Sequence, residues 1–338
     1  MSPDISVIIA AYNVECYVER AINSALIQAD GADAPVIEVI LVDDGSTDRT
    51  WEIVSRISDP RLRCFQILCN SGPGAARNAG ISLASGRWIS ILDGDDAFFP
   101  GRLARLTKLA TDQKADIVLD NLSVCRESGG APFPMFSSSR LARLSHLGLS
   151  DFIAGNQSFM GGYALGYMKP VISAEFLLQH QIRYQTDLHI GEDYLLLAQA
   201  LAMGARCVVD PAAGYLYTSR AGSVSHRLIK EDILRIIEGD ARFLSTYKLS
   251  PAAMKAQRRR EASLKEAYAF ACLVEAIKSR NILQALQAVV VVPLAARHLW
   301  RPVWKRARKI TSIFILTRKE DQDVSSKEIF NSRQRTRF

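Results

Sequence analysis

Short apolar runs alternate with amphipathic segments along the first hundred residues. The runs are rich in β-branched residues and end in polar ones, as buried strands do, and they cover residues 5–10, 37–42, 63–68 and 88–92. The segments between them repeat apolar residues at helical spacing, over residues 14–28, 51–57 and 72–84. Ser46 or Thr47 is a suitable cap for the second helix. Strands that alternate with helices predict an α/β fold with a doubly wound, mostly parallel sheet.

The middle of the chain, residues 111–211, has a mixed pattern. It predicts a strand over 116–122, a loop rich in Gly, Pro and Ser over 127–139, an apolar helix over 194–203 and a last short strand over 207–209.

From about residue 229 the pattern becomes helical. An amphipathic helix is predicted over 255–276, and the apolar stretch 282–300 is interrupted by proline and charge, so we expect an interfacial rather than a spanning helix. The polar C-terminal segment, from residue 320 onward, is expected to be disordered. We therefore predict a first domain over 1–228, a helical basic extension over 229–319 and a disordered tail over 320–338.

The positive charge is concentrated in this extension. The whole chain has a net charge of +7, but residues 251–319 hold fifteen Lys or Arg and three Glu, so the rest of the chain is acidic. Such asymmetry suggests a nucleic acid or an anionic membrane as a partner. Trp300 and Trp304 lie among the basic residues and favour the membrane surface, although a solvated basic face on a packing helix is the alternative.

The six cysteines lack metal-ligand spacing, and no signal peptide is visible at the start of the chain. We therefore expect reduced thiols and a cytoplasmic protein.

Three carboxylates follow the strand at 88–92, in the sequence Asp93-Gly94-Asp95-Asp96. Carboxylates this close repel one another, and a divalent cation with oxygen ligands is the simplest way to neutralise them. Magnesium or manganese held in this way commonly also holds a phosphate. The cluster therefore predicts a metal-bound, phosphorylated substrate, with a polar turn as the alternative.

Asp43 and Asp44 end another predicted strand. Ligands of doubly wound sheets bind at the carboxyl ends of the strands, where both acidic groups fall. The stretch from Gly72 begins like a dinucleotide-binding fingerprint, but Arg77 stands in place of the third glycine, and no Walker A sequence is present. A dehydrogenase and a P-loop kinase are therefore disfavoured.

Five short motifs occur in a fixed order: SVIIAAYN, LVDDGSTD, GPGAARNAGI, ILDGDD and GEDY. This set, which covers about residues 5–226, resembles the family 2 glycosyltransferases with their GT-A fold. Within that family the chain resembles bacterial exopolysaccharide enzymes, including those of succinoglycan assembly. The resemblance implies an inverting, metal-dependent hexosyltransferase, most simply one that moves glucose from UDP-glucose, in β linkage, to a polyprenyl-diphosphate-linked oligosaccharide. It also implies a cytoplasmic enzyme, peripheral to the inner membrane.

By this resemblance, four residues are expected to bind the donor. Tyr12 can stack on uracil, Asp44 can accept the uracil N3 proton, and Asp95 contacts the ribose. Arg77 is a helix-borne cation that can approach the nucleotide. The residues also admit simpler roles, since Tyr12 can be a core side chain and Arg77 can form a surface salt bridge.

The resemblance assigns the metal to Asp96, with Asp95 sharing it and Asp93 supporting both or filling the first position of a DxD motif. The cation, Mg²⁺ or Mn²⁺, would offset the charge of the departing diphosphate. Asp193 matches the general base that deprotonates the acceptor hydroxyl, and Glu192 is a candidate acceptor ligand. An acidic cap at a helix start is the alternative for this pair.

Arg220 and His226 lie in a segment that resembles the part of the family that closes over the donor. Three alternatives remain open at this point. The enzyme can act on lipopolysaccharide, capsule or another acceptor with a different nucleotide sugar, the basic tail can bind nucleic acid, or the chain can be a sugar nucleotidyltransferase. The last lacks its Gly-rich loop after the first strand, and no nucleic acid is expected near an acidic site.

Overall fold

The computed structural model describes residues 2–31, 34–220 and 229–281 of the chain. The chain divides into two compact units, one up to Leu264 and one from Lys265 onward. The second unit, as far as it is described, consists of the last turns of helix α10 and the residues that follow them. The basic extension beyond residue 281, the tail 320–338 and His226 lie outside the described residues.

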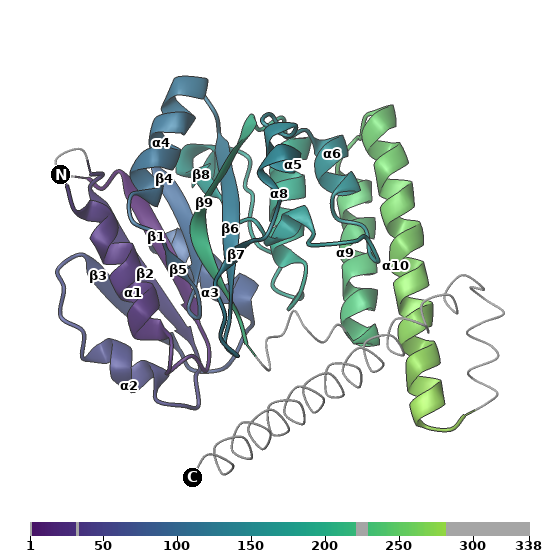
Figure 1. Cartoon of the computed structure of the whole chain (residues 1–338), viewed down its shortest axis with the longest axis horizontal. Helices are drawn as coiled ribbons and strands as arrows, with labels where there is room; N and C mark the ends of the chain where they lie inside the picture. The colour runs from purple at the N-terminus through teal and green to yellow at the C-terminus, as the bar shows by residue number, and fades with distance from the viewer. Residues whose placement is uncertain (1, 32–33, 221–228, 282–338) are drawn as a thin grey trace, which may run out of the picture. The chain divides into compact units, whose positions relative to one another are not determined.

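The first unit contains the sheet and most of the helices (Figure 1). Its N-terminal part consists of strands and helices in alternation: β1 (Ile5–Ala11), α1 (Val18–Leu26), the 3₁₀ turn η1 (Ile27–Ala29), β2 (Ile37–Asp44), α2 (Thr50–Ser55), β3 (Leu62–Ile67), α3 (Pro73–Leu83) and β4 (Trp88–Asp93).

The second part of the chain adds shorter strands and more helices. These are β5 (Ala97–Phe98), α4 (Arg102–Gln113), β6 (Ile117–Arg126), β7 (Phe133–Pro134), α5 (Ser138–Ala142), α6 (Leu149–Ala154), η2 (Leu165–Tyr167), β8 (Val171–Ser173), α7 (Ala174–Gln179), α8 (Glu192–Ala202), β9 (Cys207–Ser219), α9 (Lys230–Thr246) and α10 (Pro251–Lys278).

The strands form one sheet in the order β3-β2-β1-β4-β8-β6-β9-β5, with β7 paired to β6. The four N-terminal strands are parallel, β8 is antiparallel to both β4 and β6, and β9 is parallel to β6. The expected α/β, mostly parallel sheet is confirmed. The antiparallel β8 was not predicted, because three residues are too short a run to show a pattern.

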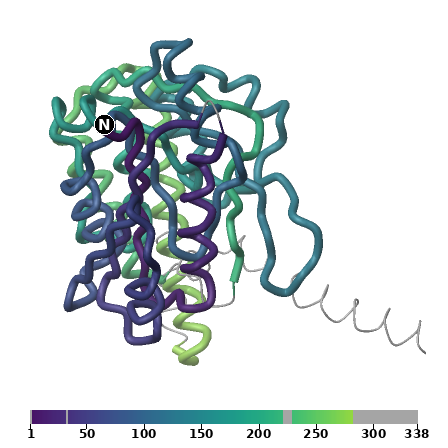
Figure 2. The backbone as a smooth tube through the Cα atoms, turned by 90° about the vertical axis from the view of Figure 1, so that its left-hand side faces the viewer, coloured from purple at the N-terminus to yellow at the C-terminus, as the bar shows by residue number. Residues whose placement is uncertain are grey.

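The inner parallel strands β1, β2 and β4 have mostly apolar sequences because they are covered on both faces, whereas the edge strand β3 is only partly buried. Ile5, Ile8 and Ile9 of β1 are fully buried. Figure 1 shows α1 across the near side of the sheet, and Figure 2 shows the N-terminal strand and α1 side by side. The return from β3 to β4 reverses the direction of winding, so a right-handed connection places α3 on the opposite face. There Gly80 fits closely: a Cβ atom on it would lie 2.4 Å from Ile8 Cγ2.

The reversal occurs between β1 and β4, which are neighbours in the sheet. The carboxyl ends of β1, β2 and β4 are Ala11, Asp44 and Asp93. Open α/β sheets bind ligands in the crevice at such a switch point. The acidic motifs therefore lie where the topology favours a ligand.

Three local expectations were wrong. The helix α2 is not capped by Ser46 or Thr47; its first N–H groups are satisfied instead by carboxylates, with Asp48 accepting from Thr50 N at 2.9 Å and Glu15 accepting from Arg49 N at 3.1 Å. The segment 127–139 is not all loop, since it contains β7 and the start of α5.

Strand β9 is also longer than expected and runs on to Ser219 instead of ending at Val209. The dipeptide Asp210-Pro211 resembles a turn, but the pairing of β9 with β6 continues past it through a register shift next to Asn121. The extension matters because it carries Tyr215 and Thr218 to the acidic cluster.

The C-terminal helices contribute to the first unit as well. Gly239 of α9 faces α8 so closely that a Cβ atom would lie 2.8 Å from Leu195 Cδ1. Helix α9 therefore packs within the first compact unit, which runs to Leu264. Among the described residues, no helix has both the length and the apolar composition needed to cross a bilayer.

Candidate active site

The three carboxylates after β4 have separate partners. Asp93 forms ion pairs with Arg77 Nη2 at 2.7 Å and Lys169 Nζ at 2.8 Å. The Asp95 carboxylate accepts a hydrogen bond from Arg220 Nε at 2.7 Å. Repulsion within the cluster is therefore relieved in part by cations from distant segments of the chain.

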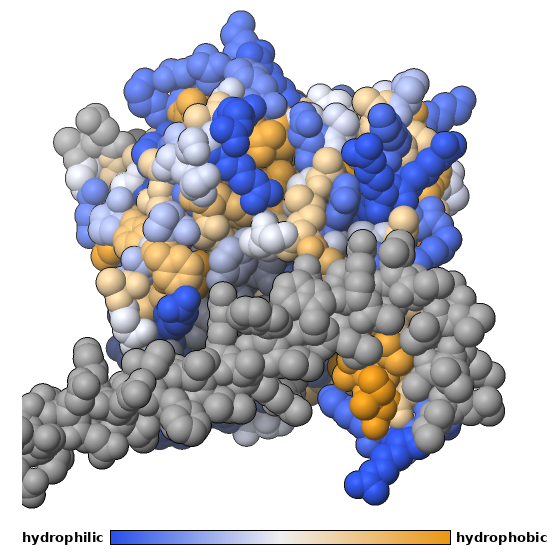
Figure 3. All heavy atoms as spheres, turned by 45° about the vertical axis from the view of Figure 1, so that its right-hand side comes forward, coloured by the Kyte–Doolittle hydropathy of each residue, from blue (hydrophilic) through white to orange (hydrophobic). Residues whose placement is uncertain are grey.

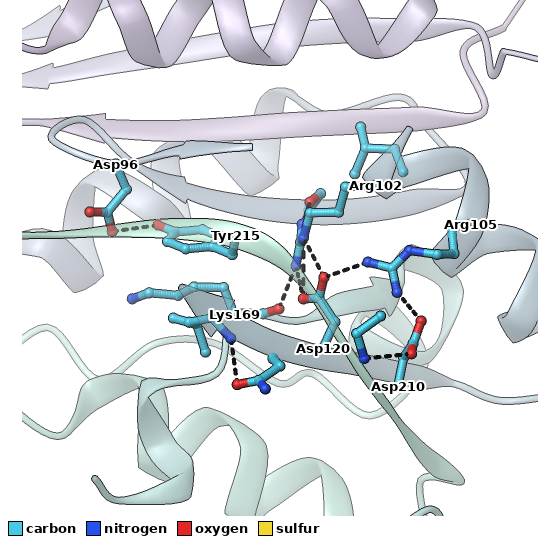
Figure 4. A network of polar contacts seen from close by, with 12 residues as sticks. Asp96, Arg102, Arg105, Asp120, Lys169, Asp210 and Tyr215 are labelled. Atoms are coloured by element: carbon cyan, nitrogen blue, oxygen red, sulfur yellow. Dashed lines mark hydrogen bonds and ion pairs between the residues drawn. The ribbon is translucent and has the colours of Figure 1, made fainter. Parts of the chain in front are cut away.

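Asp96 is completely enclosed. One of its oxygens accepts from the Tyr215 hydroxyl at 2.7 Å (Figure 4). The other oxygen accepts from the Thr218 N–H, also at 2.7 Å. Both donors lie on β9, so this strand fixes the orientation of the carboxylate.

The electrostatics divide the cluster into two parts. Burial acts to raise the pKa of Asp93, but Lys169 and Arg77 outweigh it and hold that pKa well below its usual range. Burial, and then the charge of Asp93, raise the pKa of Asp95. Burial, and then the charge of Asp95, raise the pKa of Asp96 well above its usual range. Arg77 and Lys169 thus neutralise Asp93, whereas Arg220 offsets only part of the burial and repulsion that raise the pKa of Asp95, and Asp96 has only neutral hydrogen-bond donors among the described residues.

This division tests the expected metal site. Two cations of the protein itself neutralise Asp93, so the repulsion within the cluster gives no reason to expect an external cation at this residue. Across the described ranges, no group of three or more His, Cys, Asp or Glu side chains is arranged to hold a metal ion. Asp95 and Asp96 nevertheless fit Mg²⁺ or Mn²⁺, because these ions commonly use one or two carboxylates and take further ligands from substrate phosphates.

A second cluster surrounds Arg77 at the start of α8. The Arg77 side chain is only 4% exposed, and its Nη1 lies 2.7 Å from Glu192 Oε1 and 3.1 Å from Asp193 Oδ1. Lys169 Nζ lies 2.5 Å from Asp193 Oδ2. Burial, and then the neighbouring Asp193, raise the pKa of Glu192. Three carboxylates and two cations from α3, β4, α8 and the segment before β8 therefore form one buried network.

Within this network some polar atoms lack a hydrogen bond in the described structure. They are Asp193 Oδ1, Arg77 Nε and the Tyr184 hydroxyl. The contact of Asp193 Oδ1 with Arg77 is therefore an ion-pair contact without hydrogen-bond geometry. The Tyr184 ring lies against the Arg77 guanidinium, 5.2 Å from ring centroid to Cζ.

The remaining predicted donor residues lie at the same edge of the sheet. Tyr12 is 44% exposed, which excludes a core side chain and leaves its ring accessible. The two Asp44 oxygens accept from Ser71 N at 2.9 Å and Gly72 N at 2.8 Å. Arg77, in contrast, is neither on the surface nor in a surface salt bridge.

Sequence reasoning missed Lys169, Tyr215 and Thr218. Lys169 precedes Pro170 and β8 in a stretch without a motif, and a lysine is rarely buried, so nothing in its sequence context indicated a role. Tyr215 and Thr218 were missed because the end of β9 was not predicted. Only the pairing of β9 with β6 and β5 brings them to Asp96.

The arrangement of these motifs has parallels in known proteins. The sequence model of the family "Glycosyl transferase family 2" matches residues 6–175. The chain is 44% identical over 313 residues to the succinoglycan biosynthesis protein ExoO of Rhizobium meliloti (strain 1021), a match that covers 93% of this chain and 88% of that protein. The chain belongs to glycosyl transferase family 2.

Two further similarities extend this result. The glycosyltransferase is 27% identical to the Escherichia coli UDP-Glc:α-D-GlcNAc-diphosphoundecaprenol β-1,3-glucosyltransferase WfaP, over 67% of this chain and 82% of WfaP. It also shares the fold of S. aureus TarS 1-349 in complex with UDP-GlcNAc, with a TM-score of 0.59, 22% identity and coverage of 85% of this chain and 79% of that one. The expected family and GT-A fold are confirmed.

Proposed function

We propose that this glycosyltransferase moves glucose from UDP-glucose, with inversion, to a polyprenyl-diphosphate-linked oligosaccharide in exopolysaccharide synthesis. The likeness to ExoO, named for succinoglycan biosynthesis, supports the pathway. WfaP is named for a UDP-Glc donor and a diphosphoundecaprenol-linked acceptor, which supports UDP-glucose as the donor and a lipid-linked acceptor for this chain.

The observation that carries the proposal is the placement of Asp193. It stands in the first turn of α8, and Lys169 and Arg77 connect it to Asp93 at the carboxyl end of β4. A carboxylate there can take the proton of an acceptor hydroxyl as that oxygen attacks the anomeric carbon. Attack from the side opposite the leaving diphosphate inverts the anomeric centre, so an α-linked donor gives a β-linked product.

The donor would occupy the switch point of the sheet. The exposed Tyr12 ring can stack on uracil, and Asp44, held by two backbone N–H groups, can accept the uracil N3 proton. Asp95 and Asp96 would hold Mg²⁺ or Mn²⁺. When bound, the ion offsets the negative charge that develops on the diphosphate. Arg220 forms an ion pair with Asp95, so its guanidinium lies beside the position proposed for the diphosphate.

A basic groove on α10 supports an anionic membrane surface as a partner. Lys255, Arg258 and Arg259 line it together with apolar residues. Figure 3 shows hydrophilic side chains gathered on the side where α10 begins. Basic side chains beside apolar surface suit lipid headgroups, each contributing about 1 kcal/mol near an anionic surface.

The test is a donor screen with purified protein. A panel of UDP- and GDP-sugars, each with Mn²⁺ and a polyprenyl-diphosphate-linked oligosaccharide, should give transfer from UDP-glucose and a β-linked product by NMR. Asp193→Asn should lower kcat by roughly 10²- to 10⁴-fold, the usual contribution of a general base. Preference for a GDP-sugar, or an α-linked product, would contradict the proposal.

A further inference from the structure

We infer that Lys169 is a positioning residue for the proposed catalytic base: its ammonium bridges Asp93 and Asp193 and thereby aims the Asp193 carboxylate. The inference rests on the proposed role of Asp193. It adds a residue that belongs to none of the five motifs in the sequence.

The ammonium group lies between two carboxylates. Its Nζ is 2.8 Å from Asp93 Oδ2 and 2.5 Å from Asp193 Oδ2. The Lys169 side chain is 7% exposed. A lysine is buried at low cost only when its charge is paired, and here two carboxylates supply the pairing. Burial acts to lower the pKa of Lys169, but Asp193 and Asp93 outweigh it and raise that pKa, so the side chain remains a cation.

The hydrogen bonding of Asp193 makes this contact decisive. In the described part of the chain, the carboxylate accepts one hydrogen bond, and Lys169 donates it. The neighbouring Arg77 makes an ion-pair contact without hydrogen-bond geometry and already holds Glu192 and Asp93. Without Lys169, no hydrogen bond from these residues would fix the rotation of the Asp193 carboxylate.

Lys169 is itself held from the other side. Its main-chain carbonyl accepts a hydrogen bond from Arg102 Nη2 at 2.9 Å (Figure 4). Arg102 also donates to Asp120 and to the Ser90 hydroxyl, and it is 1% exposed. The backbone of Lys169 is therefore tied through Arg102 to β4 and β6 of the sheet, which is the arrangement expected for a group that orients another.

The test separates positioning from general loss of structure. Lys169→Met keeps an unbranched side chain as far as the ε position and removes the ammonium group with its charge. We expect kcat for transfer to fall on the order of 100-fold, as for a base displaced by about 1 Å, while the KM for the donor changes little. Lys169→Arg retains a cation and should recover part of kcat. Lys108→Met, on an exposed lysine of α4 paired with Asp112, is the matched control and should leave both constants unchanged.

A double variant tests whether Lys169 acts through Asp193. If it does, adding Lys169→Met to Asp193→Asn should lower kcat by no more than about two-fold, because residues that act as a unit give non-additive losses. Multiplicative losses in the double variant, or full kcat in Lys169→Met, would overturn the inference and leave the proposed function intact. The unfolding midpoints of the wild type, Lys169→Met, Asp193→Asn and the double variant give a readout that does not depend on activity. Additive shifts there would mean that no interaction links Lys169 to Asp193, even if UDP-glucose proves not to be the donor.

Discussion

Replacing Asp120 by Asn should destabilise the protein far more than the loss of one surface charge would. Asp120 lies on β6 with a side chain that is 0% exposed, and it pairs with Arg102 at 2.8 Å and with Arg105 at 3.2 Å. Arg102 is equally buried. Asparagine has nearly the same shape, but it has no charge and presents an NH₂ group to a guanidinium that can only donate hydrogen bonds.

The magnitude follows from the burial of the remaining partner. Removing one member of a buried ion pair costs about 3–5 kcal/mol, because the other charge is left uncompensated. Arg102 retains as acceptors the Ser90 hydroxyl, the Lys169 carbonyl and at most the one amide oxygen of the new side chain, and its charge loses the carboxylate that neutralised it. At about 2–4 °C per kcal/mol for a domain of 150–250 residues, the expected fall in Tm is on the order of 10 °C.

The assay is thermal and urea unfolding followed by circular dichroism, with Asp112→Asn as the control. Asp112 pairs with Lys108 on the surface of α4, where the two side chains are 52% and 76% exposed. Such exposed i,i+4 pairs contribute about 0.3–0.5 kcal/mol. Equal losses in the two variants would refute the reasoning. The double variant Arg102→Met/Asp120→Leu should be more stable than Asp120→Asn, because it removes both charges together.

Three further variants test other parts of the structure. Gly80→Ala should lower the unfolding free energy by about 1–3 kcal/mol in urea titration, because its Cβ would overlap Ile8; an unchanged midpoint would mean that α3 can shift freely. Burial acts to raise the pKa of Glu38, but hydrogen bonds from two serine hydroxyls and a backbone N–H outweigh it and lower that pKa. The stabilisation by Glu38 should therefore be complete above the ordinary glutamate pKa of about 4.3 and be lost as the pH falls through the lowered pKa of Glu38, so that the excess stability of the wild type over Glu38→Gln shrinks on acidification. Asp44→Ala should raise the donor KM more than it lowers kcat, because it removes the acceptor of two backbone N–H groups beside the proposed uracil position; equal effects on both constants would argue against a role in donor binding.

Much of the N-terminal half was predictable from the sequence. The apolar runs that predicted strands at 5–10, 37–42, 63–68 and 88–92 correspond to β1 to β4 within one or two residues. Parallel strands covered on both faces leave a strong signal, since most positions in such a run are apolar. The same pattern placed Asp44 and Asp93 at the carboxyl edge. The short strand β8 and the far end of β9 left no such signal, because three residues and a Pro-containing bulge show no periodicity.

The sequence alone determined which carboxylates gather at the edge of the sheet, because strand ends and motif order are local properties of the chain. It did not determine which charges neutralise them. Arg77 and Lys169 come to Asp93 and Asp193 from segments up to 116 residues away, and only the packing of α3, β8 and α8 against the sheet brings them within 3.1 Å. An ion pair depends on distance and burial, and neither quantity is a property of a residue's own place in the sequence.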